Sequence, residues 1–195
     1  MAKRIILAGI LGGIAMFAWQ SIAHLLLPIG RVGVKRLDNE DAVLARLQEQ
    51  IYPPGFYLFP GMDETAGMNK AQQQEAMRRF VEKYRAGPTG ILVYHPRGQE
   101  PFAPKRFVVQ FGANLIAALL AAFLLSQAAG LKSFTERLAF VTLLGVIPTL
   151  VVNVPYWNWY GFPTNYTLAQ FVDQVVAFLA AGLVQASIVK QPSES

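Results

Sequence analysis

The stretch "FVVQFGANLIAALLAAFLLSQAA", residues 107–129, decides the fold class of this chain. It carries no charged side chain and is apolar apart from a few amides and one serine. A helix that rises about 1.5 Å per residue needs about 20 such residues to cross roughly 30 Å of hydrocarbon. The stretch therefore predicts a membrane-spanning helix.

Three further apolar stretches cover residues 5–27, 138–154 and 168–189, and we expect the helix of the second of these to begin before residue 138. In lipid, every backbone polar group must be bonded within the protein, so all four stretches are predicted to be helices rather than loops. The hydrophobic content of 53% and the mean hydropathy of +0.33 also indicate a membrane protein.

The first stretch has a second interpretation, a cleaved signal peptide. "MAKR" would be its charged start, and "SIA" at residues 21–23 would be the cleavage site. The apolar run continues through "HLLLPIG", which is longer than a signal core and favours an uncleaved anchor. Cleavage would leave three spans, with the two termini on opposite sides.

Most charged residues lie between the first two spans, in a region that predicts the order helix, strand, helix, strand. Asn39 is a suitable N-cap for the first helix, which "PPG" at 53–55 ends. The second helix, within residues 69–90, has Met77, Phe80, Val81 and Tyr84 as its expected buried stripe. The strands, "FYLF" at 56–59 and "GILVY" at 90–94, are short enough that they need each other or the helices for stability.

The chain is therefore predicted to be mainly α, with a four-helix transmembrane bundle and a small α+β extramembrane cap inserted between spans one and two. The expected parts are a transmembrane anchor helix over residues 1–28, the cap over 29–105, a three-helix transmembrane region over 106–190 and a tail over 191–195.

Capping signals predict the helix ends in the second half of the chain. Gly130 follows the second span, "SFTE" at 133–136 fits a capping box for the third, and "TLAQ" at 167–170 fits one for the fourth. The uncharged stretch "PYWNWYGFPTNYT", residues 155–167, would then connect spans three and four. Its six aromatic residues are expected to lie at a membrane interface, or to form a docking surface: Tyr156, Trp157, Trp159, Tyr160, Phe162 and Tyr166.

Because the spans alternate in direction, the intramembrane polar residues fall in one half of the bilayer. We expect a polar cluster there, with Gln20 and Thr149 beside His24, Gln110, Asn114, Asn153, Asp173 and Gln174. Asp173 is the costliest of them in lipid, and His24 is a candidate partner. The alternative partners of Asp173 are water and the start of its own helix. The side chain of His24 could instead extend to the membrane interface.

The other half of the predicted bundle carries small residues at helical spacing. Small residues let helix backbones approach closely, so we expect helix packing at Gly9, Gly13, Ala117, Ala121, Gly145, Ala177 and Ala181.

No motif predicts catalysis, a metal site or a cofactor. The chain has no cysteine, only His24 and His95 as histidines, and no phosphate-binding loop or nucleophile elbow. His95 and Arg97 in "YHPRG" are expected in a turn. Basic residues beside the spans fit anionic lipid headgroups, so membrane lipids rather than nucleic acid are the expected partners.

The orientation follows from loop charge. Lys3, Arg4, Lys132, Arg137 and Lys190 favour cytoplasmic termini, whereas the connection between spans three and four carries no charge. Basic residues beside the cap argue the other way, but that loop is too long for the rule to count reliably. We expect a multi-pass protein of a bacterial inner membrane, with the cap on the opposite side from the termini.

The motifs "GPTGILVYHPRG", "YWNWYGFPTNYTLAQ" and "GILGGIAMF" resemble those of a group of small bacterial membrane proteins with this anchor, cap and three-span layout. The resemblance implies a topology, and no catalytic residue or activity comes with it.

Three functions are compatible with these patterns. The first is an accessory subunit or assembly factor of a membrane complex, which would dock a membrane-protein partner or a second copy through the cap and the aromatic residues. The second is a binding or transport protein that holds a lipid, a quinone or another small ligand in the polar cluster. The third is an intramembrane enzyme that uses His24 and Asp173 for proton transfer.

Overall fold

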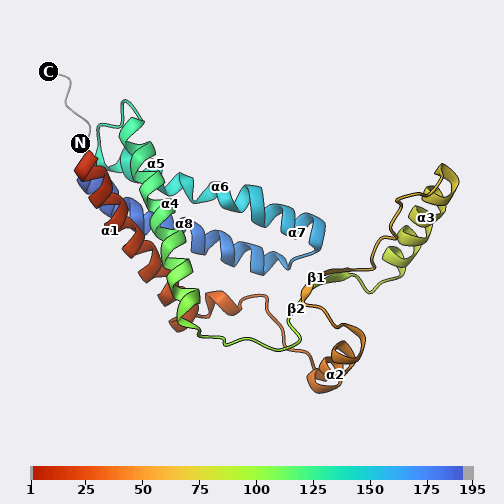
Figure 1. Cartoon of the computed structure of the whole chain (residues 1–195). Coiled ribbons are helices and arrows are strands. Elements are labelled where there is room, and N and C mark those ends of the chain that lie inside the picture. Colours follow the sequence, from red (N-terminus) through yellow and green to blue (C-terminus); the bar gives the residue numbers. More distant parts are fainter. Residues whose placement is uncertain (1, 191–195) are drawn as a thin grey trace. The chain divides into compact units, whose positions relative to one another are not determined.

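The structure, a computed structural model, describes residues 2–190, so the predicted tail over 191–195 lies outside the described residues. The chain divides into two compact units (Figure 1). Unit 1 joins Met1–Val34 to Phe102–Ser195, and unit 2 is Lys35–Pro101.

Unit 1 contains four helices that are long and apolar enough to cross a membrane, as predicted. The first is α1 (Ala2–Ser21), which continues as the π-helical turn η1 (Ile22–Leu26) and is followed by the 3-10 turn η2 (Pro28–Arg31). The second is α4 (Pro104–Gln127), and the fourth is α8 (Thr164–Ile188). The third span runs through α5 (Phe134–Leu144), α6 (Val146–Pro148), the π-helical turn η3 (Thr149–Asn153) and α7 (Val154–Tyr160).

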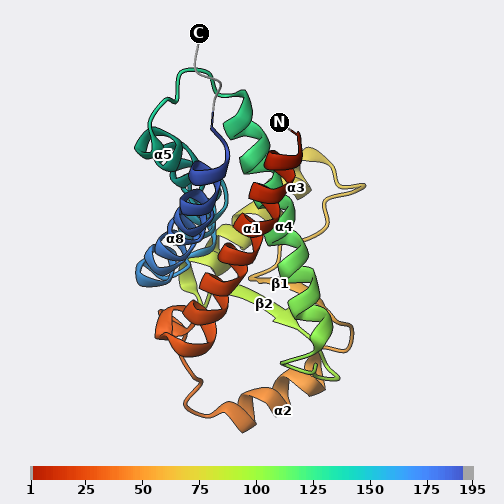
Figure 2. The same ribbon diagram turned by 90° about the vertical axis from the view of Figure 1, so that its left-hand side faces the viewer.

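The first helix is central in unit 1. It packs against both α4 and α8, and α8 packs in turn against α5 (Figure 2). The second and third spans meet through α4 and α5, which the short loop over 128–133 connects. We call the end of unit 1 with this loop the hairpin end, and the opposite end the polar end.

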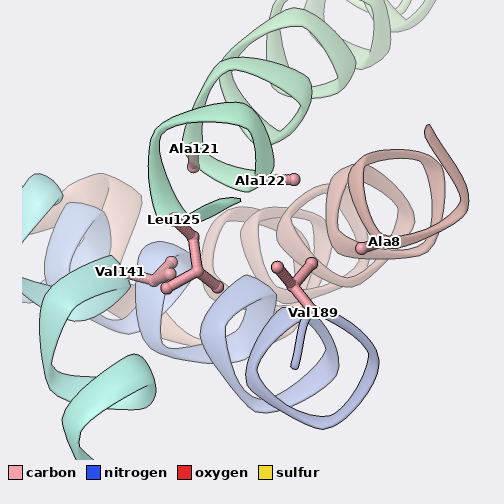
Figure 3. Close-up of a cluster of buried hydrophobic side chains, with 6 residues drawn as sticks. All are labelled: Ala8, Ala121, Ala122, Leu125, Val141 and Val189. Carbon is pink, nitrogen blue, oxygen red and sulfur yellow. The ribbon is translucent and has the colours of Figure 1, made fainter. Parts of the chain in front are cut away.

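Small side chains dominate the buried interior of unit 1. One cluster at the hairpin end contains Ala8, Ala121, Ala122, Leu125, Val141 and Val189 (Figure 3). A second cluster contains Met16, Ala118, Ala177 and Ala181. Large apolar side chains such as Leu26, Val108 and Leu143 are exposed instead. This distribution is typical of helices that pack through small residues and turn large ones towards lipid.

The third span is longer than predicted, and the aromatic residues belong to it. The capping box between Ser133 and Glu136 is confirmed, because each side chain accepts a hydrogen bond from the backbone of the other residue. The helix then continues past Pro155 to Tyr160 and ends at Gly161, whose φ of +71° is left-handed. The predicted loop over 155–167 is therefore wrong for its first half, since α7 forms the last turns of the span.

The other predicted ends differ in detail. The second span ends at Gln127, and Gly130 lies in the following loop with a φ of +85°. The capping box at 167–170 is wrong, because α8 already begins at Thr164 after Pro163. Proline fixes φ near the helical value and needs no N–H partner, which suits a residue next to a helix start.

Unit 2 has the predicted order of elements: α2 (Glu40–Gln50), β1 (Gly55–Phe59), α3 (Lys70–Ala86) and β2 (Gly90–Tyr94). The strands pair antiparallel, from Gly55 opposite Tyr94 to Phe59 opposite Gly90. Asn39 occupies the N-cap position of α2 without a side-chain bond, whereas Asn69 caps α3 in a full capping box with Gln72.

The helices of unit 2 bury very little. No residue of α2 is buried, and Ala76 is the buried residue of α3. The predicted stripe of α3 is wrong for Met77 and Tyr84, which are each 48% exposed, while Phe80 and Val81 are half-buried.

Exposed ion pairs stabilise the polar face of α3. The Arg78 guanidinium bonds Glu75 and Glu82, each at 2.7 Å. Its hydrogen bond lowers the pKa of the Glu75 carboxyl, and the same bond raises the pKa of Arg78. These contacts support the helix from its own surface without giving it a core.

Candidate functional site

The candidate site is the polar end of unit 1, where four helix segments bring polar side chains into an otherwise apolar region. These segments are the last turns of α1 with η1, the start of α4, the turn η3 and the start of α8. Their hydrogen bonds divide the predicted polar cluster into three sets, and each set joins a different pair of helices.

The first set joins α1 to α8 around Asp173, which is only 3% exposed. The indole Nε1 of Trp19 donates to Asp173 Oδ1 at 2.9 Å and to the Asp173 backbone carbonyl at 3.1 Å. His24 Nε2 lies 3.3 Å from Asp173 Oδ2. Both carboxylate oxygens therefore have a partner from the first span, which compensates for much of the cost of burying the carboxyl group.

His24 is the accessible member of this set. Its side chain is 43% exposed, whereas that of Asp173 is 4% exposed. Its other ring nitrogen, Nδ1, faces Gly30 so closely that a Cβ at Gly30 would meet it. The imidazole is thus held between the carboxylate and the backbone of η2, and one side of the ring remains open.

The second set joins α1 to α4. Gln20 Oε1 accepts hydrogen bonds from Asn114 Nδ2 at 2.8 Å and from Gln110 Nε2 at 3.1 Å. Gln110 Nε2 also donates to Asn114 Oδ1 at 3.0 Å. The three amides therefore form a small hydrogen-bonded group that links α1 to α4, and Asn114 is buried.

The third set joins the third span to α8. Thr149 Oγ1 donates to Gln174 Oε1 at 3.2 Å. Asn153 lies one helical turn further along and is half-buried, and its Nδ2 is buried without a hydrogen-bond partner. Among residues 2–190, Asn153 is the one predicted member of the cluster with a buried side-chain polar atom that lacks a hydrogen-bond partner.

The division into sets corrects the expectation of one convergent cluster. Asp173 and Gln174 are neighbours in sequence, yet Asp173 bonds α1 and Gln174 bonds the third span, because adjacent residues of a helix point in different directions. Most of the hydrogen bonds among these side chains thus join pairs of helices.

Both π-helical turns of the chain's described part lie at this polar end. Each is followed by one residue and then a proline: Ile22–Leu26 precedes Pro28, and Thr149–Asn153 precedes Pro155. Proline cannot donate a backbone hydrogen bond, so a helix ahead of it is more easily widened. Such wide turns are uncommon and occur frequently at functional sites.

The predicted aromatic residues form a connected group around the turn between α7 and α8. Tyr156 contacts Tyr160 and stacks on Phe162, which in turn contacts Tyr166. Trp157 Nε1 donates to Thr164 Oγ1 at 3.1 Å, and Trp159 is 73% exposed. The group therefore fixes the turn and still presents two tryptophan rings outwards.

The predicted small residues lie where helices approach most closely. A Cβ added at Gly9 or Gly13 would lie 2.9 Å from the Cα of Leu119 or Leu115 on α4. A Cβ at Gly145 would lie 2.8 Å from the Gln174 carbonyl oxygen on α8. Ala121, Ala177 and Ala181 are buried, whereas Ala117 is half-buried and its neighbour Ala118 is fully buried instead.

Sequence reasoning missed three polar side chains that matter for packing. Trp19 was missed because tryptophan is classed as an apolar residue, although its indole N–H needs a hydrogen-bond partner when buried. Gln185 continues the row of Ala177 and Ala181 at a spacing of four, and its Nε2 donates to the Ala118 carbonyl at 2.8 Å. Arg137, which we considered from the sequence only as a charge beside the hairpin, is 7% exposed at the hairpin end.

In unit 2, His95 and Arg97 lie in a turn, as predicted. The Gly98 N–H donates to the His95 carbonyl at 3.1 Å. Tyr52, Pro54 and this turn line a hollow in the surface of the unit. Residues 2–190 contain no group of three His, Asp or Glu side chains that could hold a metal ion.

No protein-family model, no curated protein and no solved structure matches the chain. The resemblance to a group of bacterial membrane proteins therefore stays a prediction.

Proposed function

We propose that this protein is an accessory subunit or assembly factor of a membrane complex, anchored by four spans and docking a membrane-protein partner through unit 2. The observation that supports this proposal is the apolar surface that unit 2 leaves without a partner of its own. A protein whose soluble part cannot bury its apolar faces alone gains stability when another protein covers them.

The sheet of unit 2 illustrates this surface. Phe56 lies opposite Val93, and Leu58 lies opposite Ile91, so these four side chains share one face. Phe56, Leu58 and Val93 are each more than half exposed. Val43 and Leu44 on α2 and Met77 and Tyr84 on α3 are exposed as well.

The polar end supports the same proposal by elimination. Asp173, Asn114 and Gln174 already bond residues of neighbouring helices, so they are occupied in helix packing rather than free to hold a ligand. Asn153 alone favours the second candidate, a binding protein for a lipid or quinone, because its buried amide lacks a partner.

Site-specific cross-linking in native membranes tests the docking proposal. A photo-reactive side chain is placed at Met77, on the apolar face of α3, and in a matched variant at Lys83, on its polar face. We expect a discrete protein adduct from Met77, well above the yield from Lys83, and loss of the complex in Met77→Glu.

The contrary outcome is equally clear. Equal cross-linking yields at the two positions, together with a monomer in mild detergent, would reject docking. Co-purification of a lipid or quinone that Asn153→Leu removes would support the second candidate instead.

A further inference from the structure

The hairpin end of unit 1 holds a buried cation. Arg137, in the first turn of α5, is 7% exposed. Its Nε donates to the Ala186 carbonyl at 3.0 Å, and its Nη1 donates to the Leu131 and Lys132 carbonyls at 3.3 and 2.7 Å. The guanidinium thus lies between the end of α8 and the loop that joins α4 to α5.

No carboxylate of residues 2–190 pairs with Arg137. The neighbouring acid, Glu136, accepts the Ser133 N–H at 2.8 Å and belongs to the capping box. The second terminal nitrogen of Arg137, Nη2, has no hydrogen-bond partner in the described part of the chain. Buried charges are normally paired, so this guanidinium has the capacity for an anion.

Further cations gather at the same end. The hydrophobic cluster of Figure 3 contains Val189, and Ile5 and Leu131 pack against it. These contacts bring the start of α1, the loop and the end of α8 together. The residues next to these three in sequence are basic and exposed: Arg4, Lys132 and Lys190, with Lys3 one residue further. Among the described residues of the segments that form this end, Glu136 is the one acid.

We propose that the hairpin end is a binding site for the phosphate headgroup of an anionic phospholipid. Arg137 supplies fixed donors for a phosphate oxygen, and the exposed lysines supply additional charge around it. A lipid fits better than a soluble anion because Leu7, Phe134 and Leu183 expose apolar side chains on the helices that form this end. Basic pockets between transmembrane helices are known to recognise such headgroups.

The test measures lipid retention by the full-length protein in nanodiscs of phosphatidylcholine with a small fraction of phosphatidylglycerol, using native mass spectrometry. The pair Lys132→Gln with Lys190→Gln removes two exposed charges of the site and leaves Arg137 in place. The matched control, Arg31→Gln with Lys105→Gln, removes two exposed charges from the polar end.

We expect the site pair to lower phosphatidylglycerol retention by about 10-fold or more, since a basic residue close to the bound headgroup contributes roughly 5-fold and this attraction falls off within a Debye length. The control pair lies at the other end of the unit and should change phosphatidylglycerol retention less than about 2-fold. Arg137→Gln should also abolish the preference, and the lysine pair keeps the test decisive if that variant does not fold.

Three results would overturn the proposal. The first is equal retention of phosphatidylglycerol and phosphatidylcholine by the unaltered protein. The second is an equal loss in the site and control pairs. The third is full displacement of the lipid by inorganic phosphate at millimolar concentration, which would indicate a site for a soluble anion.

Discussion

At the scale of single residues, some contacts of the polar end could be predicted from the sequence and others could not. Asp173 and His24 could be singled out because ionisable residues are rare inside apolar helices and need a partner there. The two side chains lie 3.3 Å apart, at the distance that such a pair requires. Trp19 could not be found this way, since its hydrogen-bonding group is a small part of a large apolar ring.

Trp19→Phe tests how much the indole bond to Asp173 contributes. The variant keeps an aromatic ring but leaves Asp173 Oδ1 without its donor at 2.9 Å. Because an unpaired buried polar group is costly, we expect a loss of about 1–3 kcal/mol in the free energy of unfolding, measured by circular dichroism during SDS titration in mixed micelles.

Trp157→Phe is the matched control for this change. Its indole also makes one side-chain bond, to Thr164, but at an exposed position. The control should cost less than about 0.5 kcal/mol, as exposed substitutions usually do. Equal losses of unfolding free energy in the two variants would show that the bond to Asp173 stabilises the fold no more than the exposed bond to Thr164 does.

At the scale of elements, the existence of the four long apolar helices could be predicted, and several of their ends could not. Hydropathy is a sum over many residues, so four spans were evident. The start of α5 was evident as well, because Ser133 and Glu136 carry the bonds that define it. The helix α7 was missed because Pro155 and Gly161 are typical of turns, although a helix can pass a proline when neighbouring turns widen.

The close approach of α1 and α4 can be tested with Gly13→Ala, for which Gly112→Ala is the control. Both glycines lie in spanning helices, so both changes gain the same helix propensity. A Cβ at Gly13 would lie 2.9 Å from Leu115 Cα, whereas a Cβ at Gly112 would meet nothing within 4 Å.

We therefore expect Gly13→Ala to destabilise the packing of α1 on α4 by about 1–3 kcal/mol, and Gly112→Ala to be neutral or stabilising. The same SDS titration measures both variants. An unchanged midpoint for Gly13→Ala would contradict the close approach of these two helices.

At the scale of the whole molecule, the division into a unit with four long apolar helices and a polar unit between the first two of them could be predicted, because charge and hydropathy change abruptly along the chain. The packing order of the spans could not, since each helix carries small residues on more than one face. The central place of α1 between α4 and α8 also bears on the cleavage question. Cleavage near Ala23 would remove the helix that holds both neighbours and the Trp19 partner of Asp173.

Membrane topology can be checked with single cysteines, because the natural chain has none. Gln74→Cys and Asn158→Cys should react with an impermeant maleimide from one side of the membrane, and Lys132→Cys from the other. All three positions are exposed, so a lack of reaction reports the membrane rather than burial. Labelling of Gln74→Cys and Asn158→Cys from opposite sides would exclude four alternating spans.

The contact between Trp19 and Asp173 also has a consequence for biosynthesis, because its two members lie 154 positions apart in the chain. A ribosome delivers the first span to the membrane long before the last one leaves the tunnel. The helix that carries Asp173 is therefore made after Trp19, so the donor for its carboxylate is already present when α8 is added.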